Sequence, residues 1–324
     1  MDLAGLSKQW SDDLHTNVIP FWSNALDTVN GGYNTCLDIN GTVLGDDKYM
    51  WLQGRGVWMY SRLYNTYKGV ECIGSKDHVD EVVVETWFEN AQLGARFLEK
   101  GKRKDNSLLF AVSATGTPLH FQRKPYAAVF YVLACLEYGA ALKLRENCEV
   151  NSEEVDYWFS EAEEYFDMLR TWIDDPTILN RSGADTPSGA DIPAEAAAGA
   201  IPRTDVKRAS SLADVMCLAS LAEELLKKIP SKAEQWMLHV VDAQSRVSKH
   251  YNAEKRVFME VVYGEGVSED GFATFAGRVV NPGHSIEVAW FLLHLCEISP
   301  SEKLQNMAFE VLEGSLELGW VTDS

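Results

Sequence analysis

Helical apolar spacing that recurs at a nearly constant interval is the feature of this sequence that most limits its fold. Four helix candidates begin near residues 51, 125, 204 and 284, so their starts are 74, 79 and 80 residues apart. A hairpin-like or long loop segment precedes each of them, and one further helix lies between each candidate and the next. The pattern predicts a repeated unit of two helices and an excursion, with every excursion opening on the same face.

Nine long helices are predicted from apolar residues at i, i+3 and i+4 and from the residues that break helices. They start near Leu6, Trp51, His78, Pro125, Ser152, Thr204, Ser231, His284 and Ser301. A ring of inner and outer helix pairs, the (α/α)6 toroid, is the simplest all-α architecture that fits this order. A doubly wound α/β sheet is excluded, because the buried apolar strands that it requires are absent.

A complete toroid of six pairs has twelve helices, and nine are predicted here. We therefore expect one (α/α) barrel domain over residues 1–324 that is incomplete at its C-terminus, with roughly the last three helices missing.

Short alternating stretches with turn residues lie between several of the predicted helices. GGYNTCLDINGTVLGDDKYM, residues 31–50, predicts two strands around an Asn-Gly turn. LLFAVSATGTPLHFQ, residues 108–122, predicts two strands around a Thr-Gly turn. RVFMEVVYGEG, residues 256–266, and GFATFAGRVV, residues 271–280, are expected to form a third pair of strands.

The net charge and the cysteine pattern limit which partners and which cellular compartment are expected. Lys and Arg number 29 and Asp and Glu 48, which gives a net charge of −19 and argues against nucleic acids and anionic membranes as partners. No apolar run is expected to reach membrane-spanning length. The six cysteines form no CxxC pair, and MDLAGLSKQWSDDL lacks the features of a secretory signal, so a cytoplasmic setting is expected. The sequence has no HExxH or DxDxDG motif either, so no metal site is predicted.

The stretch VVNPGHSIEVAW, residues 279–290, places an ionisable pair at the start of a predicted inner helix. Asn-Pro-Gly is a strong turn signal, His284 follows it directly, and Glu287 lies one helical turn further on the same face. Histidine can give and take protons near neutral pH, and a neighbouring carboxylate can fix its tautomer or bind a substrate hydroxyl. The alternative, an ordinary histidine in the first turn of a helix, stays open at this point.

A second constellation lies in KYMWLQGRGVWMYSRLY, residues 48–64. Trp51, Arg55 and Trp58 share one face at helical spacing. An arginine among aromatic side chains needs hydrogen-bond partners, which are either a structural carboxylate or the hydroxyl groups of a ligand. The pattern alone leaves both interpretations open.

These motifs, together with FWSNALDTVNGGYNTCLDINGTV, resemble those of the N-acylglucosamine 2-epimerase family, also known as the renin-binding proteins. The resemblance runs from about residue 8 to the end of the chain. It implies an (α/α)6 barrel and the interconversion of N-acetylglucosamine and N-acetylmannosamine by removal and return of the proton at C2. It also implies that His284 is a catalytic base and that Arg55 and Glu287 contact the substrate. Trp51 and Trp58, which share the helical face of Arg55, are predicted to contact the substrate as well.

Several further expectations depend on this resemblance. A nucleotide, usually ATP, is expected as an activator that is not consumed, and the sequence shows no motif for its site. The renin-binding name suggests a renin-like protein partner, and the exposed surface of an incomplete barrel is compatible with a homodimer. The family uses a second catalytic histidine in a segment that this sequence lacks, so little epimerase activity is expected of the 324 residues alone. A non-catalytic binding protein and a related sugar isomerase on the same barrel are the alternatives.

Overall fold

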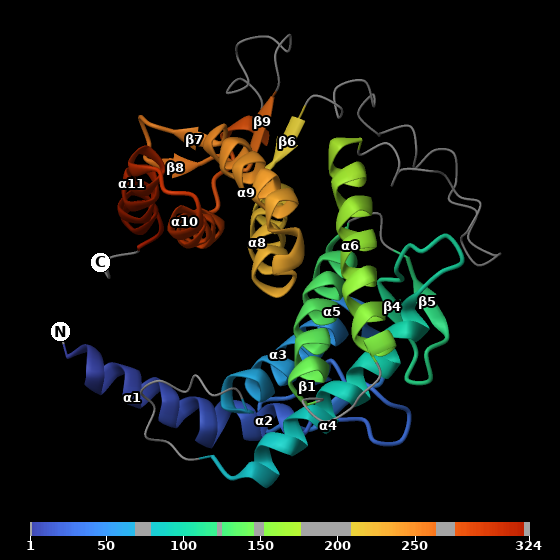
Figure 1. Ribbon diagram of the computed structural model, residues 1–324. Helices are drawn as coiled ribbons and strands as arrows, with labels where there is room; N and C mark the ends of the chain where they lie inside the picture. Colours follow the sequence, from blue (N-terminus) through green and yellow to red (C-terminus); the bar gives the residue numbers. More distant parts are fainter. Residues whose placement is uncertain are drawn as a thin grey trace, which may run out of the picture. The chain divides into compact units, whose positions relative to one another are not determined.

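The computed structural model describes residues 2–68, 79–121, 125–145, 152–175, 209–263 and 276–320 (Figure 1). The chain divides into two compact units, Met1–Phe166 and Asp167–Ser324, and each is described by itself. The expected single domain over residues 1–324 therefore stays a prediction. The predicted helix starts near His78 and Thr204 lie outside the described residues.

Unit 1, Met1–Phe166, is built on long helices. They are α1 Leu3–Asp13, α2 Ile19–Ser23, α3 Met50–Lys68, α4 Glu81–Leu98, α5 Tyr126–Arg145 and most of α6 Ser152–Asp174. A π-helical turn, Leu14–Val18, joins α1 to α2, and a 3-10 turn, Glu99–Gly101, follows α4. Helix α3 packs against both α4 and α5, and the ring of Tyr131 on α5 lies 4.6 Å from that of Tyr165 on α6.

Helix α5 is the core helix of unit 1. Its length and apolar composition would also suit a membrane span, contrary to the expectation from the sequence. However, 67% of its most apolar 18-residue window is buried within the protein. Tyr131, Val132, Cys135 and Tyr138 are each at most 1% exposed. The uniform hydrophobicity of α5 therefore reflects burial against helices around it.

The close approach of α3 and α5 depends on Gly54. A Cβ atom added to Gly54 would lie 2.7 Å from the backbone oxygen of Phe130 on α5. We therefore expect Gly54→Ala to push the two helices apart and to lower the free energy of unfolding by about 1–3 kcal/mol. Chemical denaturation measures this change. Gly45→Ala is the control, because an added Cβ there meets nothing within 4 Å, and an equal loss in both variants would contradict the packing argument.

Two of the predicted hairpins are confirmed. Strands β1 Cys36–Leu37 and β2 Val43–Gly45 pair antiparallel around Gly41, which has a φ of 84°. Strands β4 Ala111–Val112 and β5 Pro118–His120 pair around Gly116, which has a φ of 98°. Glycine suits both turns because it adopts positive φ without steric cost. A third strand, β3 Lys48–Tyr49, joins β4 and leads directly into α3.

Lys48 on β3 forms a buried ion pair with Asp27. The side chain of Lys48 has no exposed surface, and its Nζ donates to Asp27 Oδ2 at 2.7 Å and to the backbone oxygens of Gly31 at 2.6 Å and Ala114 at 3.2 Å. Burial alone would raise the pKa of Asp27, but hydrogen bonds from Lys48 and Asn30 outweigh it and bring the pKa down to about 2. These contacts join strand β3 to the loop that holds Asp27 and Gly31 and to the turn that holds Ala114.

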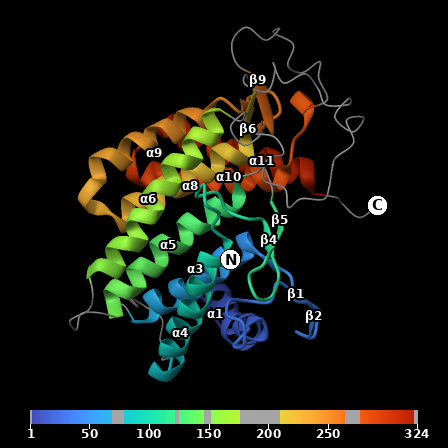
Figure 2. The same cartoon turned by 90° about the vertical axis from the view of Figure 1, so that its right-hand side faces the viewer.

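Unit 2, Asp167–Ser324, contains two helix pairs and short strands. The helices are α8 Leu212–Lys228, α9 Ala233–Ser248, α10 Pro282–Ile298 and α11 Glu302–Gly319. Helix α8 packs against α9 and α10 against α11, and α10 also contacts α8 (Figure 2). Short 3-10 turns occupy Pro230–Lys232 and Ala276–Arg278. Buried apolar residues from all four helices form one core.

The strands of unit 2 differ from the expected third hairpin. Strand β8 Val257–Phe258 pairs with β7 Tyr251–Asn252, whereas β9 Val261–Tyr263 pairs with β6 Ala209–Ser211. Residues 209–211 are therefore extended, and α8 begins at Leu212 directly after them. Pairing with β9 determines the extended conformation of these three residues. The spacing of apolar residues along the sequence cannot predict such a contact, because β9 lies about 50 residues later in the chain.

Successive helices pack as pairs, namely α3 with α4, α8 with α9 and α10 with α11, and short strands lie between these pairs along the chain, as the repeat predicted. The described parts of both units are predominantly helical, and their sheets contain only short strands of two or three residues. The all-α class with helix pairs and β excursions is thus confirmed in each unit.

Candidate active site

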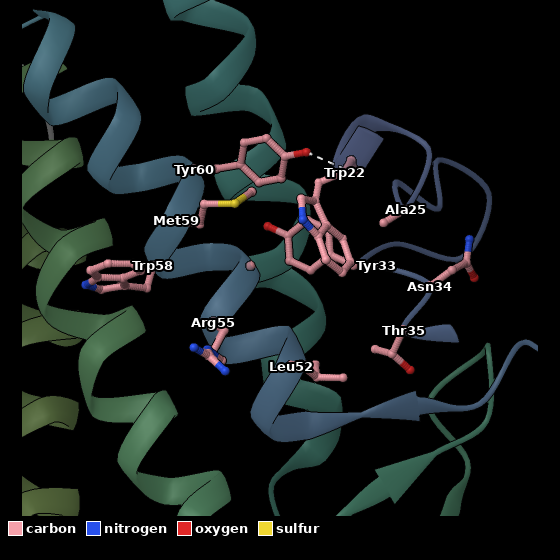
Figure 3. A pocket seen from close by; sticks show the side chains of 11 residues that line it. Trp22, Ala25, Tyr33, Asn34, Thr35, Leu52, Arg55, Trp58, Met59 and Tyr60 are labelled. Carbon is pink, nitrogen blue, oxygen red and sulfur yellow. Dashed lines mark hydrogen bonds between the residues drawn. The ribbon is translucent and has the colours of Figure 1, made fainter. Parts of the chain in front are cut away.

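Unit 1 contains a cavity of about 350 Å³ that is lined by α2, the loop after it and α3 (Figure 3). Aromatic side chains form much of its wall, including Trp22, Tyr33, Trp58 and Tyr60. The Tyr60 hydroxyl donates to the Trp22 backbone oxygen at 3.4 Å, which ties α3 to α2 beside the cavity. Such rings provide flat apolar faces of the kind on which sugar rings stack.

Arg55 lines this cavity, and its guanidinium has neither a hydrogen bond nor an ion pair with any described residue. It lies 5.1 Å from the ring centre of Phe130 and 5.8 Å from that of Trp51, so aromatic faces orient the group without using its N–H donors. The sequence left two interpretations open, a structural carboxylate partner or a ligand. No carboxylate among the described residues pairs with Arg55. The donors remain available for a ligand.

Arg62, two turns further along α3, shows the opposite arrangement. Its guanidinium lies 3.4 Å from the carboxylate of Glu137, a side chain with no exposed surface. Asn65 Nδ2 donates to the same carboxylate at 2.8 Å. Arg62 thus pairs with a buried carboxylate, whereas the N–H donors of Arg55 have no described partner.

The two predicted tryptophans lie in different surroundings. Trp58 lines the cavity together with Arg55, and Figure 3 shows both side chains leaving α3 on the side opposite Trp22 and Tyr33. The Trp51 ring instead packs 5.8 Å from Phe130 and is not among the cavity residues. Trp51 therefore contacts Arg55 without lining the cavity, and the contact of Trp51 with substrate stays a prediction.

Unit 2 holds the second group of predicted site residues, at the first turn of α10. Asn281 is the N-cap, and its side-chain oxygen accepts hydrogen bonds from the backbone nitrogens of Gly283 at 3.0 Å and His284 at 3.3 Å. Pro282 occupies the first helical turn, where it leaves no donor unsatisfied. The turn predicted from Asn-Pro-Gly therefore begins the helix and fixes the backbone of His284.

A carboxylate from outside the helix contacts the imidazole of His284. Its Nδ1 lies 2.9 Å from Oε1 and 3.1 Å from Oε2 of Glu260, whose side chain is only 15% exposed. None of the described residues hydrogen-bonds Nε2, and 35% of the His284 side chain is exposed. The ring is thus bound on one nitrogen and open on the other.

Glu287 lies one turn after His284 but forms no hydrogen bond with it. Burial raises the pKa of Cys217 on α8 to about 12, and the negative charges of Asp214 and Glu287 add to this effect. Glu287 therefore faces the start of α8. The carboxylate beside His284 that the sequence suggested is Glu260, which precedes β9 and lies 24 residues earlier in the chain.

Two other histidines of unit 2 contact groups within that unit. His250 is buried, with Nδ1 2.7 Å from the Met259 backbone oxygen and Nε2 2.9 Å from the Ser210 hydroxyl. His294 on α10 lies 3.2 Å from Glu223, a carboxylate that also pairs with Lys227. Among the described residues, no three His, Cys, Asp or Glu side chains cluster as metal ligands would.

Comparison with known proteins adds a family to this geometry. Residues 218–324, which include Glu260, His284 and Glu287, match the family described as N-acylglucosamine 2-epimerase (GlcNAc 2-epimerase). The N-acylglucosamine 2-epimerase of Mus musculus is 30% identical over 289 residues, or 85% of this chain. The chain is thus similar to members of the N-acylglucosamine 2-epimerase family. It spans 56% of the length of the mouse protein.

Solved structures share the fold of this chain. Cellobiose 2-epimerase from Bacillus thermoamylovorans B4167 matches 99% of this chain and 74% of its own, with a TM-score of 0.70 at 16% identity. A D-mannose isomerase matches 94% of this chain and 70% of its own, with a TM-score of 0.65 at 13% identity. The likeness confirms the predicted (α/α)6 toroid class.

The predicted site residues thus fall into two groups that are described separately, the Arg55 cavity in unit 1 and the His284 group in unit 2. That they bind one substrate together stays a prediction. The residue that the sequence did not reveal is Glu260. A signal was present, since Glu260 is the single charged residue in the otherwise apolar run VFMEVVY, residues 257–263.

Proposed function

We propose that the protein is a sugar 2-epimerase and that its substrate is an N-acyl-D-glucosamine. The observation that carries the proposal is the His284 imidazole, which has a carboxylate at Nδ1 and no described partner at Nε2. A histidine held in this way can accept a proton at Nε2 near neutral pH. Its location within the region that matches the epimerase family supports this role.

The proposed reaction starts from the open-chain sugar. The C2–H bond is acidified by the neighbouring aldehyde, so a base can remove this proton and leave an enolate. In our proposal Nε2 of His284 takes the proton, and the positive charge that results on the ring is stabilised by Glu260. Return of a proton to the opposite face of C2 gives the epimer, and no atom is gained or lost overall.

In the same proposal, Arg55 and Glu287 bind the sugar. The unused N–H groups of Arg55 can donate to sugar oxygens, and the Trp58 ring beside it offers an apolar face. Glu287 is half-buried and can accept hydrogen bonds from sugar hydroxyls.

A panel of sugars tests the proposed function. The chain is incubated with N-acetylglucosamine, N-acetylmannosamine, cellobiose and mannose, with and without ATP, and the products are separated by chromatography. We expect the two N-acetylated sugars to be interconverted, slowly if the second base lies outside these residues, and ATP to raise the rate. Conversion of cellobiose alone would contradict the proposed N-acyl substrate.

A related sugar isomerase is the second candidate, because the chain shares its fold with a D-mannose isomerase. Proton removal from C2 is common to both reactions, but the isomerase returns the proton to C1 and yields a ketose. The panel distinguishes the two, because fructose from mannose would support the isomerase and N-acetylmannosamine from N-acetylglucosamine the epimerase.

Arg55→Ala is expected to weaken sugar binding by about 10- to 100-fold, because a hydrogen bond to a charged group contributes about 1.5–3 kcal/mol. Isothermal calorimetry with N-acetylglucosamine measures the change in Kd. The unfolding free energy is expected to change little, since Arg55 has no described hydrogen-bond partner.

Arg62→Ala is the matched control on the same helix. It removes the cationic partner of the buried Glu137 carboxylate, so it is expected to lower stability and to leave the Kd for the sugar nearly unchanged. If the two variants weakened sugar binding equally, Arg55 would have no specific role in recognition.

A further inference from the structure

We propose that Glu260 is a positioning residue that fixes the tautomer of His284, so that Nδ1 carries the proton and Nε2 is the free base. This inference deepens the proposed function and rests on it for its catalytic meaning. The tautomer itself is a property of the folded chain and can be measured without any substrate.

The geometry of the pair allows one arrangement of the ring proton. Both oxygens of Glu260 lie within hydrogen-bonding distance of Nδ1, at 2.9 and 3.1 Å. An ionised carboxylate only accepts hydrogen bonds, so Nδ1 must be the donor. In the neutral imidazole a proton on Nδ1 leaves a lone pair on Nε2, which is the nitrogen without a described partner.

The backbone of Glu260 is held from two sides. Its nitrogen donates to the Val279 backbone oxygen at 3.1 Å, and its own oxygen accepts from the Leu212 nitrogen at 2.8 Å. Residues 261–263 directly after it are paired with β6. The carboxylate is therefore delivered to the ring by a stretch of backbone that is fixed at the starts of both α8 and α10.

The His284 backbone is held as well, by the Asn281 cap. Both partners of the pair are thus anchored independently of the contact between them. The ring has little freedom to rotate, because rotation would break a hydrogen bond to a carboxylate that is only 15% exposed.

A second histidine–glutamate pair on the same helix provides a contrast. His294 contacts Glu223 at 3.2 Å, but Glu223 also accepts a hydrogen bond from Lys227, and the His294 side chain is 45% exposed. The lysine shares that carboxylate, whereas no described cation shares Glu260 with His284. The Glu260 carboxylate is therefore available entirely to the imidazole.

The direct test is nitrogen NMR of the chain labelled with 15N-histidine, recorded where the spectrum shows the neutral ring. The His284 signals are assigned from their loss in His284→Gln. We expect a protonated Nδ1 and an unprotonated Nε2 in the unaltered chain. In Glu260→Ala the proton is expected to move to Nε2 in a substantial share of molecules, whereas Glu260→Gln keeps it on Nδ1 because the amide oxygen still accepts.

Glu223→Gln is the matched control and is expected to leave the His284 signals unchanged. A protonated Nδ1 with a bare Nε2 in Glu260→Ala, as in the unaltered chain, would overturn the proposal. So would a protonated Nε2 before any substitution. Circular dichroism of each variant shows whether α10 is still folded, and the tautomer measured in the unaltered chain keeps the test decisive if Glu260→Ala unfolds.

Proton exchange at C2 of N-acetylmannosamine in deuterated water supplies the catalytic part of the test. Glu260→Ala is expected to lower the exchange rate about 10- to 100-fold, the cost typical of removing a group that orients a functional histidine. Glu260→Gln is expected to lose less, and sugar affinity is expected to hold in both. If no variant exchanges the proton but the tautomer shifts as described, the proposed function fails and the positioning role stands.

Discussion

Deuterium exchange at C2 of N-acetylmannosamine is expected to fall by about 10²- to 10⁴-fold when His284 is replaced by alanine, the range typical of losing a general base. The reason is structural, since Nε2 of His284 is the nitrogen left open by the hydrogen bond of Nδ1 to Glu260. Mass spectrometry of the recovered sugar in deuterated water measures both exchange and epimerisation. Exchange without epimerisation in the unaltered chain would show that a base removes and returns the proton on one face of C2 and that no group delivers a proton to the other face.

His294→Ala is the matched control for this experiment. It removes a histidine from the same helix that also contacts a glutamate, but one whose carboxylate is shared with a lysine. We expect it to leave the exchange rate unchanged within about twofold, the tolerance expected of a surface change. Normal exchange by His284→Ala would remove the base from the proposed mechanism.

Lys48→Met is expected to lower the free energy of unfolding by about 3–5 kcal/mol, because it leaves the Asp27 carboxylate buried without its cation. The backbone oxygens of Gly31 and Ala114 lose the same donor. Denaturation in urea, followed by tryptophan fluorescence, measures the loss. Lys8→Met removes an exposed pair with Asp12 and is expected to change stability by less than about 1 kcal/mol.

The double variant Lys48→Met/Asp27→Leu separates the cost of the unpaired charge from the value of the pair. With both charges gone, we expect much of the lost stability to return, because no buried ion remains without a partner. A double variant that is less stable than Lys48→Met would show that the pair itself, and not the orphaned carboxylate, dominates.

The same pair gives unit 1 a defined acid sensitivity. The pKa of Asp27 is held at about 2, below its usual 3.8, so this carboxylate stabilises the fold fully above pH 3.8. The contribution is lost as the pH falls from there through about 2. Asp27→Asn is expected to flatten the stability curve in this window, and stability curves of equal slope would contradict the assignment.

Local spacing predicted most of the fold. The apolar stripe of α4, with Val84, Trp87, Phe88 and Ala91 at i, i+3, i+4 and i+7, is the kind of pattern on which helix prediction depends, and it is buried as expected. The Asn-Gly and Thr-Gly turns of two hairpins were also recognisable, since each requires a residue with positive φ. What the spacing could not reveal is which strands pair across the chain, and β6 with β9 is the clearest case.

The candidate site was predictable to a similar degree and for related reasons. The Asn-Pro-Gly turn located His284 at the start of a helix, because capping and proline placement are local effects. Whether Arg55 had a structural partner could not be decided from sequence, since the acid that pairs with Arg62 lies 75 residues away on another helix. Glu260 was missed for the same reason, as its contact with His284 depends on how β9 and α10 meet.

Asn281 links the start of α10 to the placement of the imidazole that follows it. The same amide oxygen of Asn281 caps the helix and accepts a hydrogen bond from the His284 backbone nitrogen. Formation of this helix end and orientation of the His284 ring are therefore coupled. Substitutions at the turn and at the histidine should for that reason behave non-additively. Transfer of the His284 site to another scaffold would therefore require the Asn-Pro-Gly turn as well.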